Sequence, residues 1–138
     1  MSFSDASLEV QKAIVDRLQA DAGFNTVAGG RIYDAVPYPV TMPYANFSSF
    51  DLLPEGGDCI EGGDVFVTLD AWAKGPQSVE IKKVGKAIAA ALDKAPLELE
   101  APQRLVQMSL ERTQYLRDPD GITAHAVLTF RAMTEPTS

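Results

Sequence analysis

The chain has 138 residues, of which 46% are hydrophobic and 22% are charged, and its formal net charge is −7. This length and composition predict a single folded domain over residues 1–138 and argue against a disordered chain. The net negative charge argues against a protein that binds nucleic acid tightly, because neutralising phosphates requires Lys and Arg. It does not argue against a protein past which DNA moves without being bound.

The charge is unevenly placed along the chain. Residues 1–69 hold ten acidic and three basic residues, whereas residues 70–138 hold nine of each. No apolar run approaches the roughly 18 residues that span a bilayer, and no charged-then-apolar leader precedes the first predicted helix. One cysteine, Cys59, excludes an internal disulfide framework and suits a reducing compartment. We therefore expect a soluble protein made in the cytoplasm.

The first predicted element is a helix over residues 6–22, which Ser4 or Ser7 can cap and Gly23 can end. Its buried stripe consists of apolar residues at helical spacing, Val10, Ile14 and Leu18. Residues 27–34 predict a turn and a short extended piece. The segment that follows is not predicted to be helical, because it contains three prolines, Pro37, Pro39 and Pro43.

Two strands and a second helix are predicted next. Residues 44–52 and 65–73 have the composition of strands, and residues 53–64 between them, with four glycines and four acids, predict a mobile acidic loop. Gly75-Pro76 ends the second strand and starts a helix, in which Gly85 permits close approach to a sheet. Its apolar seam is Ile81, Val84, Ile88 and Leu92, and the residues off this seam include Lys82, Lys83 and Lys86.

A type I turn is predicted at Asp118-Pro119-Asp120-Gly121, because Asp, Pro and Gly occupy its preferred positions. Extended runs flank the turn, so residues 104–135 predict a hairpin with a three-residue loop, a left-handed glycine and a G1 bulge. Closing the loop on Asp118 and Ile122 separates apolar from polar side chains. This register pairs Leu110 with Phe130 and Met108 with Ala132 on one face, and Ser109 with Arg131, Glu111 with Thr129 and Tyr115 with His125 on the other.

The predicted hairpin is long for a domain of this size. An arm over residues 104–117 extends roughly 48 Å, whereas a chain of this length has a diameter of about 37 Å. Near the turn the core face is no longer purely apolar, because the register sets Arg112 against Leu128 and Gln114 against Ala126. We therefore expect the tip to project beyond the core rather than the strands to bend hard.

Together these elements predict an α+β fold: a mainly antiparallel sheet of about four to five strands, two amphipathic helices packed on one face, and a long C-terminal β-hairpin. The other sheet face is expected to carry polar residues together with Trp72, Val127 and Tyr115. Such a face is too apolar to be simply hydrated and is typical of a subunit contact.

Residues that could perform chemistry are few. His125 is the only histidine and has no Ser or Cys nucleophile nearby in sequence, which favours a sheet-surface or interface position over a general base. Cys59 lies among glycines and acids, without the neighbouring cation that activates a thiolate. Asp118 and Asp120 are explained as turn formers. Three lysines predict a solvated helix face or, alternatively, a contact with the acidic half of a neighbouring copy: Lys82, Lys83 and Lys86.

The acidic residues between positions 51 and 64 lack the alternation and the terminal Glu of an EF-hand, so a solvated loop is favoured over a weak cation site. They are Asp51, Glu55, Asp58, Glu61 and Asp64. Glycine pairs match neither a Walker loop nor a dinucleotide fingerprint. We predict no catalytic residue, no metal site and no cofactor, and therefore no enzyme.

Two groups of residues support a family resemblance: Gly30-Arg31-Ile32-Tyr33-Asp34 with Pro37 and Pro43-Tyr44, and Arg117-Asp118-Pro119-Asp120-Gly121 followed by Phe130-Arg131-Ala132. In this order and spacing they resemble the small tail-completion, or tail-terminator, proteins of long-tailed bacteriophages and gene transfer agents. The resemblance covers residues 7–135, except for residues 53–64.

This resemblance implies a virion structural protein. Such proteins form a ring, typically a hexamer, on the head-proximal end of the tail tube, end its polymerisation and dock the tail to the head, and DNA passes through the lumen. The implied partners are further copies of the chain, a tail tube protein and a head-side connector or neck protein, with no membrane. The implied location is the tail–head junction of a virion or gene transfer agent particle, after synthesis in the bacterial cytoplasm.

For such a ring we expect inter-subunit or tube contacts at Trp72, Lys82, Lys83, Lys86, Tyr115, Leu116, Arg117, Asp118 and His125. The acidic residues between positions 51 and 64 are candidates for a lumen wall or a partner face, since negative charge repels a passing duplex. Three other functions stay open on the sequence: a different neck or head-completion ring component, a small ligand-binding regulatory domain that dimerises through its sheet, and an enzyme with a pocket joining His125, Tyr115 and Glu111.

Overall fold

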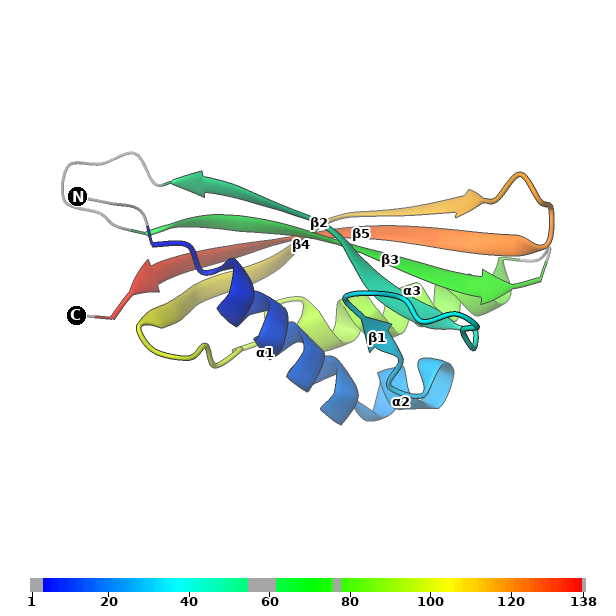
Figure 1. Cartoon of the computed structure of the whole chain (residues 1–138), viewed down its shortest axis with the longest axis horizontal. Helices are drawn as coiled ribbons and strands as arrows, with labels where there is room; N and C mark the ends of the chain where they lie inside the picture. Colours follow the sequence, from blue (N-terminus) through cyan, green and yellow to red (C-terminus); the bar gives the residue numbers. More distant parts are fainter. Residues whose placement is uncertain (1–3, 55–61, 76–77, 138) are drawn as a thin grey trace.

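The computed structural model describes residues 4–54, 62–75 and 78–137. Its elements in chain order are α1 (Ser7–Ala20), α2 (Ala22–Ala28), β1 (Ile32–Tyr33), β2 (Tyr44–Pro54), β3 (Gly63–Lys74), α3 (Val79–Leu92), β4 (Gln103–Arg117) and β5 (Thr123–Pro136). The five strands form one sheet in the order β1-β2-β3-β5-β4. The helices cover one face of this sheet and leave the other face open (Figure 1). The predicted α+β class is confirmed, with three helices in place of two.

The first predicted helix is in fact two helices, and the caps predicted for it are wrong. Asp5, rather than Ser4 or Ser7, accepts a hydrogen bond from the first backbone N–H of α1, at 2.8 Å. Asp21 ends α1 and caps α2, because its carboxylate accepts from the backbone N–H of Phe24 at 2.8 Å. The left-handed C-cap is Gly29, with φ at 58°, and not Gly23. The caps at Asp21 and Gly29 and the burial of Phe24 thus stabilise α2, a short helix whose residues have weak intrinsic helix propensity.

The core lies between the helices and the covered sheet face. Along β3 the odd-numbered residues from Val65 to Ala73 are buried, whereas the alternating residues are partly exposed, as their period of two predicts. The predicted seam of α3 is buried as well: Ile81, Val84, Ile88 and Leu92. Burial of this apolar face against the sheet is the main stabilising contribution to the fold.

Both ends of the segment predicted as a mobile acidic loop, residues 53–64, belong to strands. Residues 53 and 54 belong to β2 and residues 63 and 64 to β3, and the ladder pairs Leu53 with Asp64. Asp64 is a buried strand residue, which corrects its assignment to an exposed loop. Glu55, Asp58, Cys59 and Glu61 lie outside the described residues.

The hairpin follows the predicted register only in its middle. Leu110 pairs with Phe130, Met108 with Ala132 and Ser109 with Arg131, as expected. A bulge between Leu110 and Arg112 then shifts the register by one residue, so the pairs predicted nearer the turn are wrong. The observed pairs there are Arg112 with Thr129, Thr113 with Leu128, Tyr115 with Ala126 and Leu116 with His125. An extra residue in one strand exchanges the faces of everything beyond it.

The turn itself contains the predicted left-handed glycine, Gly121, with φ at 75°. The Gly121 N–H donates to the Asp118 carbonyl at 3.0 Å, and the Asp118 N–H donates to the Thr123 carbonyl at 2.9 Å. The loop therefore closes on Thr123, one residue later than the predicted Ile122.

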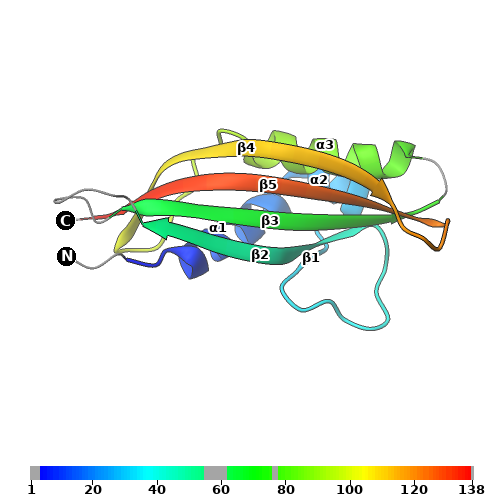
Figure 2. The ribbon, with the colours of Figure 1, turned by 90° about the horizontal axis from the view of Figure 1, so that it is seen from above.

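The hairpin is not a projecting arm, contrary to expectation. Strand β3 accompanies β5 as far as the pair of Lys74 with Thr123, so only the turn extends past this ladder. Figure 2 shows the long strands curving over the helical layer. Two bulges in β4 favour this bending, since bulges increase local twist.

Candidate functional site

The open sheet face holds an aromatic stack on β3 and β5, near the end at which the hairpin turns. Trp72 on β3 and His125 on β5 are direct cross-strand partners. Their rings are stacked, with centroids 3.8 Å apart and planes 6° from parallel. The carboxylate Oδ1 of Asp70 lies 3.2 Å from the imidazole Nε2, a distance that suits an ion pair but lacks the alignment of a hydrogen bond. The side chains of Asp70 and His125 are both about four-fifths buried, although they face away from the helices.

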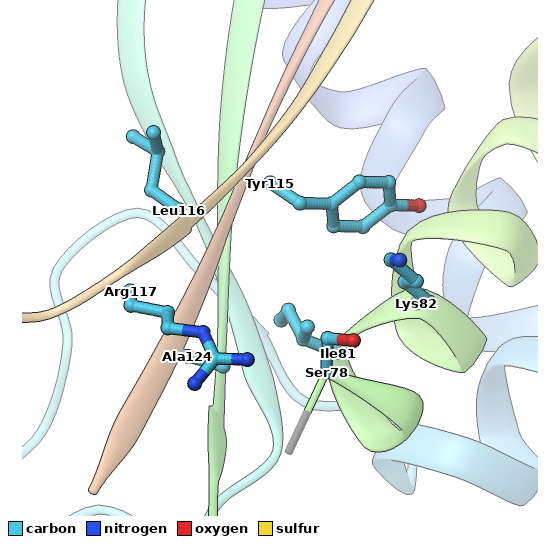
Figure 3. A pocket seen from close by; sticks show the side chains of 7 residues that line it. All are labelled: Ser78, Ile81, Lys82, Tyr115, Leu116, Arg117 and Ala124. Carbon is cyan, nitrogen blue, oxygen red and sulfur yellow. The ribbon is translucent and has the colours of Figure 1, made fainter. Parts of the chain in front are cut away.

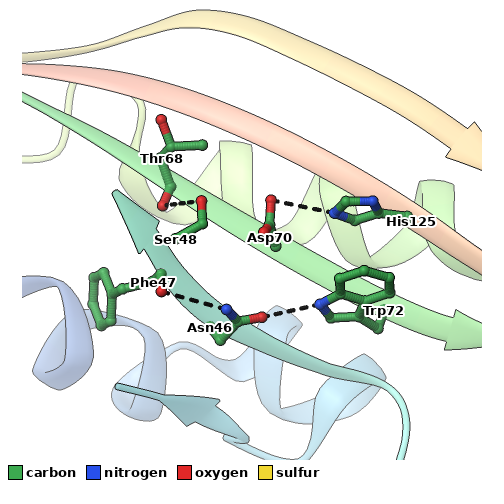
Figure 4. Close-up of polar contacts among 7 residues, drawn as sticks. All are labelled: Asn46, Phe47, Ser48, Thr68, Asp70, Trp72 and His125. Atoms are coloured by element: carbon green, nitrogen blue, oxygen red, sulfur yellow. Dashed lines mark hydrogen bonds and ion pairs between the residues drawn. The ribbon is translucent and has the colours of Figure 1, made fainter. Parts of the chain in front are cut away.

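Strand β2 supplies the polar partner of this stack. The indole N–H of Trp72 donates to the side-chain oxygen of Asn46 at 3.0 Å, and Asn46 in turn donates to the carbonyl of Phe47 at 3.3 Å (Figure 4). Tyr44, the cross-strand partner of Trp72, is almost fully buried. Burial raises the pKa of the Tyr44 phenol, and the negative charge of Asp70 raises it further. We call Tyr44, Asn46, Asp70, Trp72 and His125 the open-face cluster.

The other notable surface lies where α3 meets the end of the hairpin. Tyr115 points from β4 toward α3, whereas its neighbour Leu116 points away to the open face (Figure 3). The Tyr115 ring lies against Gly85, and the Lys82 ammonium is 5.9 Å from its centroid. Burial raises the pKa of the Tyr115 phenol. The glycine therefore permits the close approach that its position in the helix predicted, and a tyrosine fills the space.

A half-open cavity of about 220 Å³ adjoins this contact. Its lining combines apolar, hydroxyl and cationic side chains: Ser78, Ile81, Lys82, Tyr115, Leu116, Arg117 and Ala124. We call it the hairpin-base cavity. Its chemistry suits an apolar or aromatic group with a carboxylate beside it.

The structure distributes the residues predicted to make contacts over the open sheet face, the hairpin-base cavity and the exposed side of α3, with Leu116 and Lys82 also lining the cavity. Trp72, His125 and Leu116 share the open face, with Leu116 directly opposite His125. The prediction that Tyr115 lies beside His125 is wrong, because the bulge turns Tyr115 toward α3. Arg117 lines the cavity, and Asp118 forms the turn. The three lysines of α3 are exposed, as predicted: Lys82, Lys83 and Lys86.

The two described residues of the acidic set differ in their surroundings. Asp51 is exposed on β2. Asp64 is buried on β3, where it accepts from Arg131 Nε at 2.9 Å and lies 2.7 Å from its terminal nitrogen. Asp64 is therefore part of a structural ion pair and does not contribute a free charge to a surface.

Two features were not singled out from the sequence. Asn46 and Asp70 complete the open-face cluster, and the alternation of β3 already placed Asp70 on the face of Trp72. Residues 34–39 form an exposed segment in which Tyr38 is 99% accessible. Its prolines indicated the irregular backbone but not its exposure.

Within residues 4–54, 62–75 and 78–137, no group of three or more His, Cys, Asp or Glu side chains is arranged to hold a metal ion. In the same part of the chain, no helix is long and apolar enough to cross a membrane.

Most of the chain matches a known family. The model of the family described as "Tail completion protein gp17" matches residues 12–135. The chain belongs to this family. No curated protein matches the chain.

A solved structure agrees with this membership of the tail completion proteins. A chain from a structure described as "Virion of native gene transfer agent (GTA) particle" superposes with a TM-score of 0.86 at 25% sequence identity. The match covers 94% of the present chain and 97% of the other. The predicted family resemblance is confirmed, and this tail completion protein has a structural role in a phage-type or gene transfer agent particle.

Proposed function

We propose that this tail completion protein forms a ring, a hexamer, on the head-proximal end of a tail tube. The ring ends tube polymerisation and presents the surface on which the head-side connector or neck protein docks. One observation supports the proposal: both the family match and the virion likeness extend over nearly the whole chain. We assign no catalytic role to the protein.

The open sheet face supports an assembly function. Asp70 and His125 are about four-fifths buried on this face, and the exposed Leu116 lies opposite His125. An apolar patch rimmed by polar side chains is typical of a protein–protein contact. The open-face cluster and Leu116 therefore contact the tube protein or a neighbouring copy in this proposal. The exposed lysines of α3 supply charge at the ring contact, facing the acidic first half of the next copy.

DNA is proposed to pass through the ring without being held. The net charge of −7 is repulsive to phosphates, and repulsion from the wall prevents trapping of a passing duplex. Asp51, which is exposed on β2, is one candidate for this wall. No membrane takes part.

Electron microscopy of particles produced without this protein tests the proposal. Over-long tails, or tails without heads, are expected, and reintroducing the wild-type gene restores normal particles. Tails of normal length attached to empty or leaking heads would instead assign the protein to the head side of the neck. Normal, filled and joined particles would exclude both roles.

A further inference from the structure

The connection between β1 and β2 exposes an apolar segment. Residues 34–39 are all exposed, Tyr38 is 99% accessible, and Val36 is 40% accessible. Figure 2 shows this connection reaching away from the sheet on the side of β1 and β2. Pro37 and Pro39 flank Tyr38 and restrict its backbone, so little conformational entropy is lost when the segment docks. A preorganised, fully exposed aromatic side chain is the kind of residue that anchors an interface.

The segment carries a single charge. Asp34 is the only charged residue between positions 32 and 50. The segment thus offers an aromatic ring, aliphatic surface and one carboxylate. A complementary surface needs an apolar recess of the size of one ring with a cation beside it.

The hairpin-base cavity has these properties. Its volume of about 220 Å³ exceeds the ~150 Å³ that accommodates a benzene molecule. Ile81 and Ala124 provide apolar walls, and Lys82 and Arg117 provide positive charge. The Ser78 hydroxyl adds a hydrogen-bonding group that suits a phenol.

The two surfaces belong to opposite edges of the sheet, an arrangement that suits contact between neighbouring copies. The loop belongs to the β1–β2 edge of the sheet, whereas the cavity is formed by α3 with β4 and β5 at the other edge. Both lie at the same end of the strands. The base of the loop, residues 40–43, adjoins Lys74 of β3 and Glu80 of α3, and Ala124 in the cavity wall pairs with Ala73, the neighbour of Lys74. A closed ring repeats one contact between two different patches of the same chain. Opposite edges at one end of the sheet satisfy this condition.

We infer that Tyr38 of one copy inserts into the hairpin-base cavity of the next copy, with Asp34 facing Arg117 and Lys82. This inference rests on the proposed ring and names the contact that closes it. The contact is heterologous, it joins one carboxylate to two cations, and it repeats around a closed ring.

Site-specific photo-cross-linking in assembled particles tests the contact. Tyr38→p-benzoylphenylalanine is expected to fold normally, since the side chain makes no use of the core, and irradiation should yield multiples of the chain mass. Mass spectrometry should place the links in peptides containing residues 78–82 or 115–124. Leu8→p-benzoylphenylalanine, on the 72% accessible side chain of Leu8 in α1, is the matched control and should not give these links. Links to other regions, links to another particle protein, or no links at all would overturn the inference.

A charge exchange gives an independent readout. Asp34→Arg and Arg117→Asp should each reduce incorporation into particles by about tenfold, and the double variant should restore most of it. Absence of rescue, with each variant folded, would contradict the contact. The wild-type protein separates the two hypotheses: if it is absent from tail ends, the ring function fails, whereas its presence there without cross-links or rescue rejects only this contact.

Discussion

Tyr115 lies so close to Gly85 that a Cβ built on the glycine falls within about 3.0 Å of the phenol oxygen and ring carbons. Gly85→Ala is therefore expected to lower the free energy of unfolding by about 1–3 kcal/mol, the usual cost of overpacking. Alanine has the higher helix propensity, so propensity alone predicts the opposite sign. Urea unfolding of the wild type and the Gly85→Ala variant shows whether overpacking or helix propensity dominates.

The control for this prediction removes the tyrosine. In a Tyr115→Ala background, Gly85→Ala should be neutral or stabilising by up to about 1 kcal/mol, because only the propensity difference remains. An equal loss of stability in both backgrounds would show that the tyrosine is not the cause.

The hydrogen bond from Trp72 to Asn46 predicts a second effect. Asn46→Ala removes the acceptor of the indole N–H and should cost about 0.5–1.5 kcal/mol of stability. Trp72 is the only tryptophan, so its fluorescence emission should shift specifically as its surroundings change. Ser49→Ala, at an exposed position of the same strand, is the control and should change neither quantity appreciably.

The ion pair of Asp64 with Arg131 is expected to be structural. Asp64→Asn leaves Arg131 beside a neutral amide in a mostly buried site, and the loss of a charge-assisted hydrogen bond should cost about 1.5–3 kcal/mol. Asp51→Asn removes the same charge from an exposed position on the adjacent strand and should change stability by less than about 0.5 kcal/mol. Thermal unfolding compares the two, and equal effects would contradict the structural assignment of Asp64.

The hairpin turn should be sensitive to acid. The Thr123 hydroxyl and the N–H groups of Ile122 and Thr123 donate to the Asp120 carboxylate and hold its pKa below the ordinary 3.8. A lowered folded-state pKa means that the contribution of Asp120 to stability is present above about pH 4 and is lost as pH falls through the folded-state value. Carbon NMR titration of the Asp120 carboxyl should show this pKa, and Thr123→Val should raise it. An unchanged pKa in that variant would contradict the role of the hydroxyl.

The end of β4 is expected to act in assembly. Leu116→Ser combined with Arg117→Ser changes two exposed side chains and should leave a folded protein, with unfolding free energy within about 1 kcal/mol of wild type. Incorporation into tails should nevertheless fall. Circular dichroism and particle counts by electron microscopy check the two halves of this prediction, and normal capping by the variant would exclude a role for this end of the hairpin.

Periodicity and turn chemistry predicted much of the fold from local information. The two faces of β3, the seam of α3 and the left-handed Gly121 depend only on residues close in sequence. Each was therefore visible without tertiary contacts. The motifs of the family resemblance, such as Arg117-Asp118-Pro119-Asp120-Gly121, are likewise a property of the chain alone.

The tertiary structure decided what the candidate surfaces look like. The bulge in β4 inserts one residue between Leu110 and Arg112, and this single insertion carries Tyr115 from the open face to Gly85 on α3. A bulge depends on how both strands pack over the helices, and the sequence of either arm does not reveal it. Strand order likewise brings Trp72 onto His125 and buries Asp64 with Arg131 across positions far apart in the chain. Local sequence thus determined which faces and turns exist, whereas packing between distant segments determined which side chains meet.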